Sequence, residues 1–234
     1  MSLFRKNTAT AVAERTSIVD LTKKAAVSLT KAGLVDAKAA VYLVLDHSGS
    51  MQGFYRDGSV QRLAEQALGL SANLDDDGTV PIVYFGSRAE SPVDARLDCY
   101  TGIIDRTHSQ VRWGSTNYVA AMQEVIDDYQ YQASGVQVPG LVIFQTDGSP
   151  DDKRAAEQML REASSLPIFW AFVGFGDSIS FLERLDDLTG RAVDNAGFFH
   201  ARDPRSVSDE ELYDGITREY ASWLTAARNA GILR

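Results

Sequence analysis

Three short segments of this 234-residue chain carry the side chains that could do chemistry, and their carboxylates and hydroxyls all offer oxygen. The segments read Asp46-His47-Ser48-Gly49-Ser50, Gly114-Ser115-Thr116-Asn117 and Thr146-Asp147-Gly148. Hard oxygen donors without imidazole or thiolate suit Mg²⁺, Mn²⁺ or Ca²⁺ and disfavour zinc. We therefore expect one divalent cation, Mg²⁺ first with Mn²⁺ or Ca²⁺ as alternatives. The expected ligands are Asp46, Ser48, Ser50, Thr116 and Asp147.

This ligand set leaves room for a ligand from another molecule. Two carboxylates balance a divalent charge, and three hydroxyls leave a position for water or for an outside group. A carboxylate from outside the chain would complete the shell. His47 lies between two expected ligands, so its ring should point away from the metal, toward the surface or a partner. No general base is visible, so we expect a binding protein rather than an enzyme.

Short apolar runs must position these side chains, because two of the runs end at or just before Asp46 and Asp147. The runs are β-branched and aromatic and are apolar on both faces, which is typical of strands in a parallel sheet covered by helices. Four strong runs span residues 40–45, 80–85, 141–144 and 168–173. Weaker runs at 93–100 and 197–201 predict an edge strand and a last strand.

Helical patterns alternate with these strands. Ser149 as a cap and Pro150 at the first helical position predict one helix start, and an apolar stripe predicts a last helix over 209–230. The alternation indicates an α/β fold with a doubly wound, mostly parallel six-stranded sheet, in the Rossmann-like order 3-2-1-4-5-6 with an antiparallel edge strand and helices on both faces. In that order the strands before Asp46 and Asp147 are neighbours at the switch point, where such sheets bind ligands.

The charge of the chain is unevenly distributed. The net charge is −9, yet residues 1–31 carry +4 and the rest −13. We expect a flexible basic arm over residues 1–16, a helical extension over 17–37 and a domain over 38–230. An acidic body repels phosphate backbones, so nucleic acid is not an expected partner.

The compartment follows from what the sequence contains. No window approaches the ~18 consecutive apolar residues of a membrane helix, so we expect no integral membrane segment, and the N-terminus has no signal-peptide core. One cysteine, Cys99, cannot form an internal disulfide. A cytoplasmic protein is therefore expected.

The three oxygen-bearing segments, in this order, resemble the von Willebrand factor A (vWA) domain and its metal-ion-dependent adhesion site. The resemblance covers about residues 38–230 and implies a vWA fold. It also implies that Ser48, Ser50 and Thr116 ligate the metal directly or through water, that Asp46 and Asp147 act largely through waters, and that a partner's Glu or Asp is the sixth ligand.

A narrower resemblance comes from the lysine-bearing segment 17–34 and from the Asp-rich turn 75–78. Together they look like the bacterial vWA proteins of the tellurite or toxic-ion resistance (Ter) group. This implies a role in a bacterial tellurite or chemical-stress resistance system.

Two other functions stay open at this point. One is a Mg²⁺-dependent phosphohydrolase with Asp46 as nucleophile, although Ser48 stands where such enzymes carry a second acid. The other is a structural subunit whose metal only locks the fold. A closed metal site would favour the structural subunit over the binding module.

Overall fold

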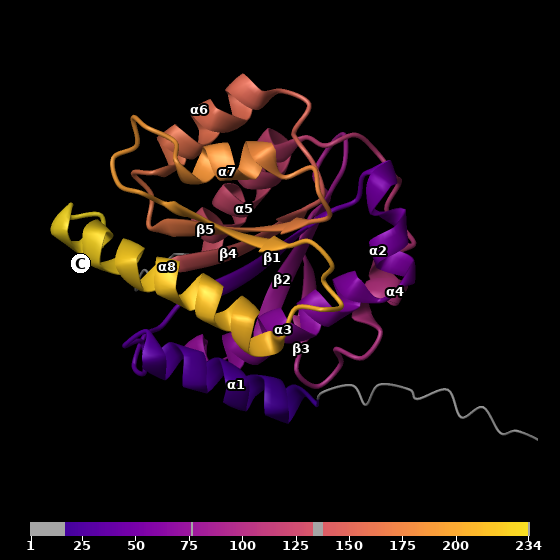
Figure 1. The fold of residues 1–234 in the computed structure, drawn as a ribbon, viewed down its shortest axis with the longest axis horizontal. Coiled ribbons are helices and arrows are strands. Elements are labelled where there is room, and N and C mark those ends of the chain that lie inside the picture. Colours follow the sequence, from indigo (N-terminus) through magenta and orange to yellow (C-terminus); the bar gives the residue numbers. More distant parts are fainter. Residues whose placement is uncertain (1–16, 76, 133–137, 234) are drawn as a thin grey trace, which may run out of the picture.

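The computed structural model describes residues 17–75, 77–132 and 138–233, so the basic arm expected over 1–16 lies outside the described residues. Within these ranges six strands form one sheet in the order β3-β2-β1-β4-β5-β6 (Figure 1). The strands are β1 (Ala40–Asp46), β2 (Thr79–Phe85), β3 (Val93–Arg96), β4 (Gly140–Thr146), β5 (Ile168–Phe175) and β6 (Ala196–Ala201). Only β3 is antiparallel to its neighbour among these strands. The predicted strand order and the antiparallel edge strand are confirmed.

The central strands are buried on both faces, as their apolar runs predict. Every residue of β4 and β5 is buried. Along β1, Leu43 packs in the core on one side of the sheet and Val44 in the core on the other, because side chains alternate along a strand. The parallel register pairs Leu45 with Gln145, which brings the carboxyl ends of β1 and β4 side by side.

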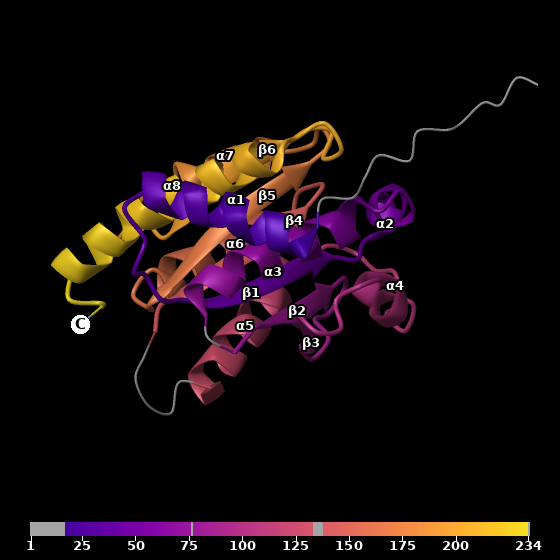
Figure 2. The ribbon, with the colours of Figure 1, turned by 90° about the horizontal axis from the view of Figure 1, so that it is seen from below.

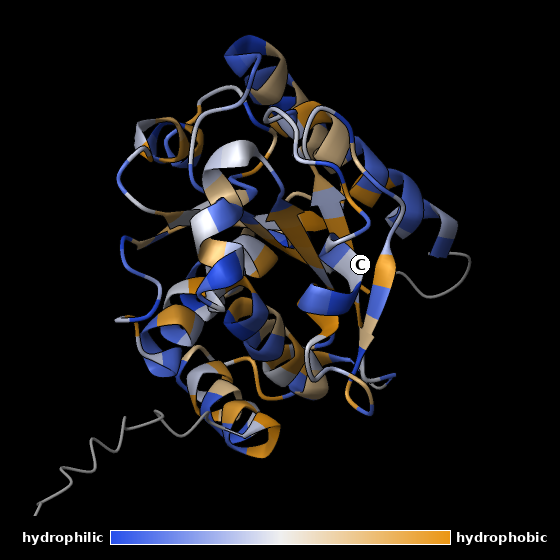
Figure 3. Ribbon diagram, turned by 90° about the vertical axis from the view of Figure 1, so that its right-hand side faces the viewer, coloured by the Kyte–Doolittle hydropathy of each residue, from blue (hydrophilic) through white to orange (hydrophobic). Residues whose placement is uncertain are grey.

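Helices cover both faces of the sheet (Figures 1 and 2). Helices α1, α3 and α8 lie on one face and α5, α6 and α7 on the other. Helices α2 and α4 lie at one end, and Figure 3 looks onto that end and shows the hydrophobic strands enclosed by more polar helices and loops. The helices are α1 (Ile18–Lys31), α2 (Gln52–Arg56), α3 (Ser59–Leu74), α4 (Ile103–His108), α5 (Tyr118–Gln132), α6 (Lys153–Ala163), α7 (Ser180–Asp186) and α8 (Asp209–Asn229), with a 3₁₀ turn at Gly49–Met51.

Helix α1 packs against α3 and α8 and shares their core. Leu21, Ala25 and Leu29 are buried there. The helices approach closely at Gly69 of α3, where an added Cβ would lie 2.8 Å from the Leu21 Cβ. Lys24 also pairs with Asp209 at the start of α8, at 3.0 Å. The N-terminal helix is thus packed against the rest of the molecule.

Helix α6 begins later than its sequence predicts. The expectation was a cap at Ser149 with Pro150 as the first helical residue, but the observed cap is Asp152, whose carboxylate accepts the N–H of Ala155 at 2.9 Å. An Asp caps a helix as well as a Ser does, so the later signal prevails. Asp151 therefore stays in the loop before the helix.

In the described part of the chain, no helix combines the length and the apolar character needed to cross a membrane.

Candidate metal centre

Asp46 anchors the first segment at the end of β1. Its side chain has no solvent exposure. One carboxylate oxygen accepts the Ser48 N–H at 2.7 Å, and the other accepts the Thr146 hydroxyl from β4 at 2.6 Å. The carboxylate therefore joins the ends of two neighbouring strands and turns the chain so that Ser48 and Ser50 follow in the loop.

A chain of hydroxyls connects this loop to the second aspartate. The Ser48 and Ser50 hydroxyl oxygens lie 3.2 Å apart, and the Ser50 hydroxyl donates to the Asp147 carboxylate at 2.9 Å. Ser48 is 4% exposed, whereas Ser50 is exposed and Asp147 is half-buried. The structure thus brings four of the five predicted residues together, and the cluster is open to solvent on the Ser50 side.

Thr116, the fifth predicted residue, contacts Asp151 through its backbone. Its N–H donates to both carboxylate oxygens of Asp151 at 3.2 Å, and its carbonyl accepts the Asp151 N–H at 2.9 Å. Among the hydrogen bonds of the described residues, none joins the Thr116 side chain to the other four. Sequence reasoning missed Asp151, and the signal that could have found it was Asp152, which caps α6 and leaves Asp151 in the loop.

The loop that carries Thr116 reaches the first segment through Gly114. The Gly114 N–H donates to the His47 carbonyl at 3.1 Å, and Gly114 forms an isolated bridge with Ser48. An added Cβ at Gly114 would lie 2.5 Å from the Ser87 backbone nitrogen, so only glycine fits there. Glycine at this position therefore allows the Thr116 loop to approach β1.

The electrostatics of the cluster fit a divalent cation. Burial raises the pKa of Asp46 to about 6, against the opposing effect of its hydrogen bonds from Thr146 and Ser48, and burial also raises the pKa of Asp147. Neither carboxylate forms a salt bridge with a Lys, Arg or His of the described residues. Two desolvated carboxylates without a Lys or Arg are costly unless a bound cation supplies the positive charge.

The donor set is also poor in strong ligands. No three His, Cys, Asp or Glu side chains form a possible metal cluster in the described residues. A cation at Asp46 and Asp147 would therefore depend on hydroxyl oxygens and on ligands from outside, and oxygen-only donors are those of hard cations.

His47 does not point to the surface, so this expectation was wrong. The residue has no exposed area, and its Nε2 lies 3.3 Å from Nδ1 of His108. Its ring stacks on the Trp113 indole, with the two ring centroids 3.7 Å apart, and burial lowers the pKa of His47 to about 4. The ring is neutral at physiological pH and packs beneath the rim of the site.

Comparisons with known proteins give a family and a fold. Residues 38–233 match the family described as "vWA found in TerF C terminus". The Bacillus subtilis (strain 168) protein YcbR is 31% identical over 222 residues, which cover 92% of this chain and 90% of that protein. This share of the chain is larger than residues 38–233 make up, so the similarity extends into the residues before 38.

Solved structures share the fold at low sequence identity. A von Willebrand factor type A protein from Catenulispora acidiphila has a TM-score of 0.56 and 15% identity, over 79% of this chain and 43% of that chain. Proximal thread matrix protein 1 from the mussel byssus, in a structure with a zinc-occupied MIDAS motif, has a TM-score of 0.51 and 15% identity, over 84% of this chain and 48% of that chain. This chain therefore spans less than half the length of either structure.

Proposed function

The chain belongs to the family of von Willebrand factor A domains found at the C terminus of TerF, and from this premise we propose that it is a metal-dependent protein-binding module. A partner's Asp or Glu carboxylate completes the metal shell. One observation carries the proposal. The buried Asp46 and the half-buried Asp147 have no Lys or Arg partner in the described part of the chain, and Asp46 holds the backbone of Ser48, whose hydroxyl leads through the exposed Ser50 hydroxyl to Asp147.

Each residue has a defined part in this proposal. Ser48, Ser50 and Asp147 present oxygens to one divalent cation, Mg²⁺ first, and Thr116 joins them from its loop. Asp46 holds the Ser48 backbone and is itself held by Thr146. The bound cation would attract an anionic oxygen from outside. The exposed Ser50 leaves that position open to solvent.

Two observations favour binding over the other functions. Asp46 has no exposed area and both its oxygens accept hydrogen bonds, whereas a nucleophile must reach its substrate. Ser50 is exposed, whereas a metal that only locks the fold would be closed to outside ligands.

The module would have a basic arm over residues 1–16, a helical extension over 17–37 and the vWA domain over 38–230.

The family supports a biological setting for the module. Its Ter-type character favours a place in a bacterial tellurite or chemical-stress resistance system in the cytoplasm. In that setting the chain would recruit another protein rather than transform a toxic ion.

Two measurements test the proposal. Calorimetric titration with Mg²⁺ should show one site in the wild type and at least tenfold weaker binding in Ser50→Ala, while the matched control Ser91→Ala, an exposed serine outside the cluster, should bind normally. Co-purification should then retain a partner with Mg²⁺ and lose it with EDTA or in Ser50→Ala. Equal capture under all conditions would contradict a metal-bridged contact.

A further inference from the structure

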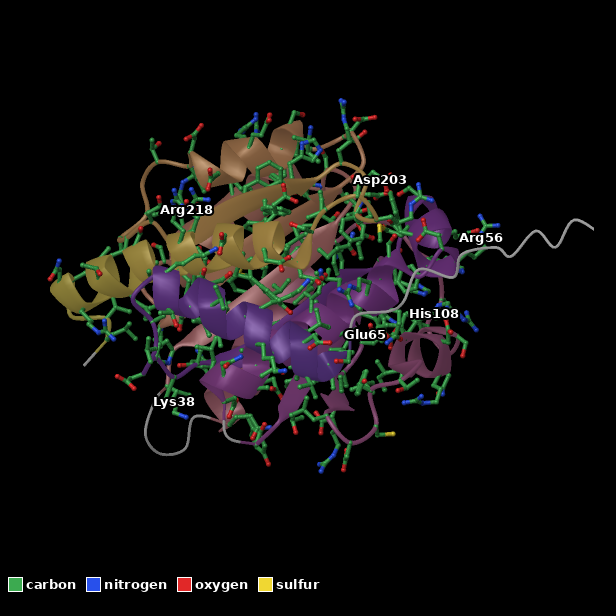
Figure 4. All side chains as sticks on the ribbon, turned by 60° about the horizontal axis from the view of Figure 1, so that its bottom comes forward. Lys38, Arg56, Glu65, His108, Asp203 and Arg218 are labelled. Atoms are coloured by element: carbon green, nitrogen blue, oxygen red, sulfur yellow. The ribbon has the colours of Figure 1, made fainter. Side chains whose placement is uncertain are left out.

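A hollow of about 320 Å³ lies beside the candidate metal site. It is lined by Gln52, Tyr55, Arg56, Asp105, His108 and Trp113. Gln52 follows Ser50 by two residues, and Trp113 directly precedes Gly114, which bonds to the His47 carbonyl. Figure 4 shows the labelled Arg56 and His108 at the same end of the molecule. The hollow therefore borders the loops that carry the candidate ligands.

Trp113 forms a fixed aromatic wall of this hollow. The residue is 39% exposed, yet its indole stacks on the buried His47 ring with an interplanar angle of 10°. The Tyr55 ring meets it edge-on, at a centroid distance of 5.3 Å. A tryptophan that is exposed and already fixed loses little entropy on docking, and such residues carry much of the binding energy of interfaces. Trp113 is thus preorganised to contact a partner.

Unpaired cations flank this tryptophan. Arg56 is exposed, its Nε donates to the Gln52 carbonyl at 3.2 Å, and it has no ion pair within the described residues. Arg112, the neighbour of Trp113 in sequence, likewise has no carboxylate partner in that part of the chain. It lines a second hollow of about 480 Å³ that Trp113 also lines, where Arg88 is already paired with Glu90 at 2.9 Å.

These guanidinium groups stand out because the protein has a net charge of −9. Asp105 is the one carboxylate among the six lining residues, and it comes from α4 whereas Arg56 comes from α2. An incoming carboxylate is therefore attracted to the α2 side and repelled by the α4 residue. The lining thus carries one cation and one anion, and the feature that favours a carboxylate is the unpaired Arg56 on the α2 side, while Asp105 keeps that carboxylate away from α4.

We propose, resting on the metal-dependent binding described above, that the partner presents an acidic segment rather than a single acid. One carboxylate of the segment completes the metal shell. A second carboxylate, a few residues away, pairs with Arg56 in the hollow, and the chain between them packs on Trp113. The hollow beside the metal then determines which acidic segments are recognised.

Synthetic fluorescein-labelled peptides of defined charge test this inference. One peptide carries a single Asp, a second series carries two Asp separated by one to four Gly, and a third series replaces the second Asp by Lys. Fluorescence anisotropy measures their binding to the full chain in Mg²⁺ and in EDTA. The proteins are the wild type, Arg56→Gln and the matched control Arg154→Gln, an exposed arginine of α6 that does not line the hollow.

In Mg²⁺ the best two-Asp peptide should bind about fivefold more tightly than the single-Asp peptide, as expected for one added exposed ion pair. In Arg56→Gln the two-Asp peptide should bind no more tightly than the single-Asp peptide does, whereas Arg154→Gln should keep the gain. Binding of the two-Asp peptide should also reduce the quenching of tryptophan fluorescence by acrylamide. This change reports on Trp113, because Trp170 and Trp223 are buried and contribute little to the quenching.

The possible failures are distinguishable. If single-Asp binding depends on Mg²⁺ but no second Asp adds affinity, or if the gain survives in Arg56→Gln, the acidic-segment inference is wrong and the proposed function stands. Tighter binding of the Lys series would overturn the inference in the same way. If no peptide responds to Mg²⁺, the proposed function is wrong, and the inference that rests on it falls too.

Discussion

Replacing Asp46 by Asn should stabilise the metal-free protein and remove its response to Mg²⁺. In the folded state burial raises the pKa of this carboxyl from 3.8 to about 6. The folded protein therefore holds the proton more tightly than the unfolded chain does. The stability that this provides is complete below pH 3.8 and is lost as the pH rises through 6, where Asp46 becomes a buried anion.

The size of the effect follows from the same shift. Keeping Asp46 ionised at pH 7.5 costs about 3 kcal/mol, at about 1.4 kcal/mol per pKa unit. The Asn side chain avoids this cost, and its carbonyl oxygen can still accept the Ser48 N–H. Its NH₂ group replaces the oxygen that accepts the Thr146 hydroxyl, and the loss of that hydrogen bond removes about 1 kcal/mol of the gain. A net gain of about 2 kcal/mol corresponds to a melting temperature about 4–8 °C higher for a chain of this size.

Thermal unfolding at pH 7.5, in EDTA and in saturating Mg²⁺, measures the effect. The wild type should be less stable than Asp46→Asn in EDTA, and Mg²⁺ should stabilise only the wild type, by about 2.7 kcal/mol at a hundredfold excess over Kd. Asp209→Asn is the control, because Asp209 is buried beside Lys24 and Arg62 and should lose stability under both conditions. If Asp46→Asn were less stable than the wild type in EDTA, the carboxylate would not be an uncompensated charge and the reasoning would be refuted.

Further variants test the pH dependence, the core, the loop and the arm. Calorimetry should show Mg²⁺ affinity falling about tenfold per pH unit below 6, because protonated Asp46 no longer supports the site, and an unchanged affinity at pH 5 would contradict this. Leu21→Ala should lower the free energy of unfolding in denaturant by about 2–4 kcal/mol, since the side chain is buried between helices. Val27 of α1 is 53% exposed, so Val27→Ala should change the free energy of unfolding by no more than about 0.5 kcal/mol. Gly114→Ala should weaken Mg²⁺ binding in the same titration, because its Cβ displaces the loop against Ser87, and normal binding would show that the loop tolerates a shift. Deleting residues 1–16 should leave the melting temperature within about 2 °C, and a larger loss would show that the arm stabilises the domain.

The sheet and most of the cluster were predictable because their signals are local. Runs such as residues 40–45 are apolar on both faces, which few structures other than a covered parallel strand accommodate. Once β1 and β4 are neighbours, Asp46 and Asp147 must meet at one edge, and alternation along the chain carries Ser48 and Ser50 to the same place. The fold and four residues of the cluster therefore followed from pattern and topology.

The parts that sequence reasoning missed depend on competition or on distance along the chain. Ser149 and Asp152 are both good caps, and only packing decides where α6 begins, so the sequence signal that leaves Asp151 in the loop beside Thr116 was ambiguous. His47 and His108 are 61 residues apart, and no local pattern indicates that they meet. Their contact depends on how α4 packs, which is a tertiary effect.

The position of α1 has a consequence for synthesis of the protein on the ribosome. This helix leaves the ribosome before α3 and α8 do, yet it is buried against both, and the Lys24–Asp209 hydrogen bond joins residues 185 positions apart. The part of the apolar side of α1 that α8 covers therefore stays exposed until α8 has been synthesised. In nascent chains halted before residue 209, α1 should be bound by chaperones or digested by protease. In chains long enough for α8 to have left the ribosome, α1 should be protected.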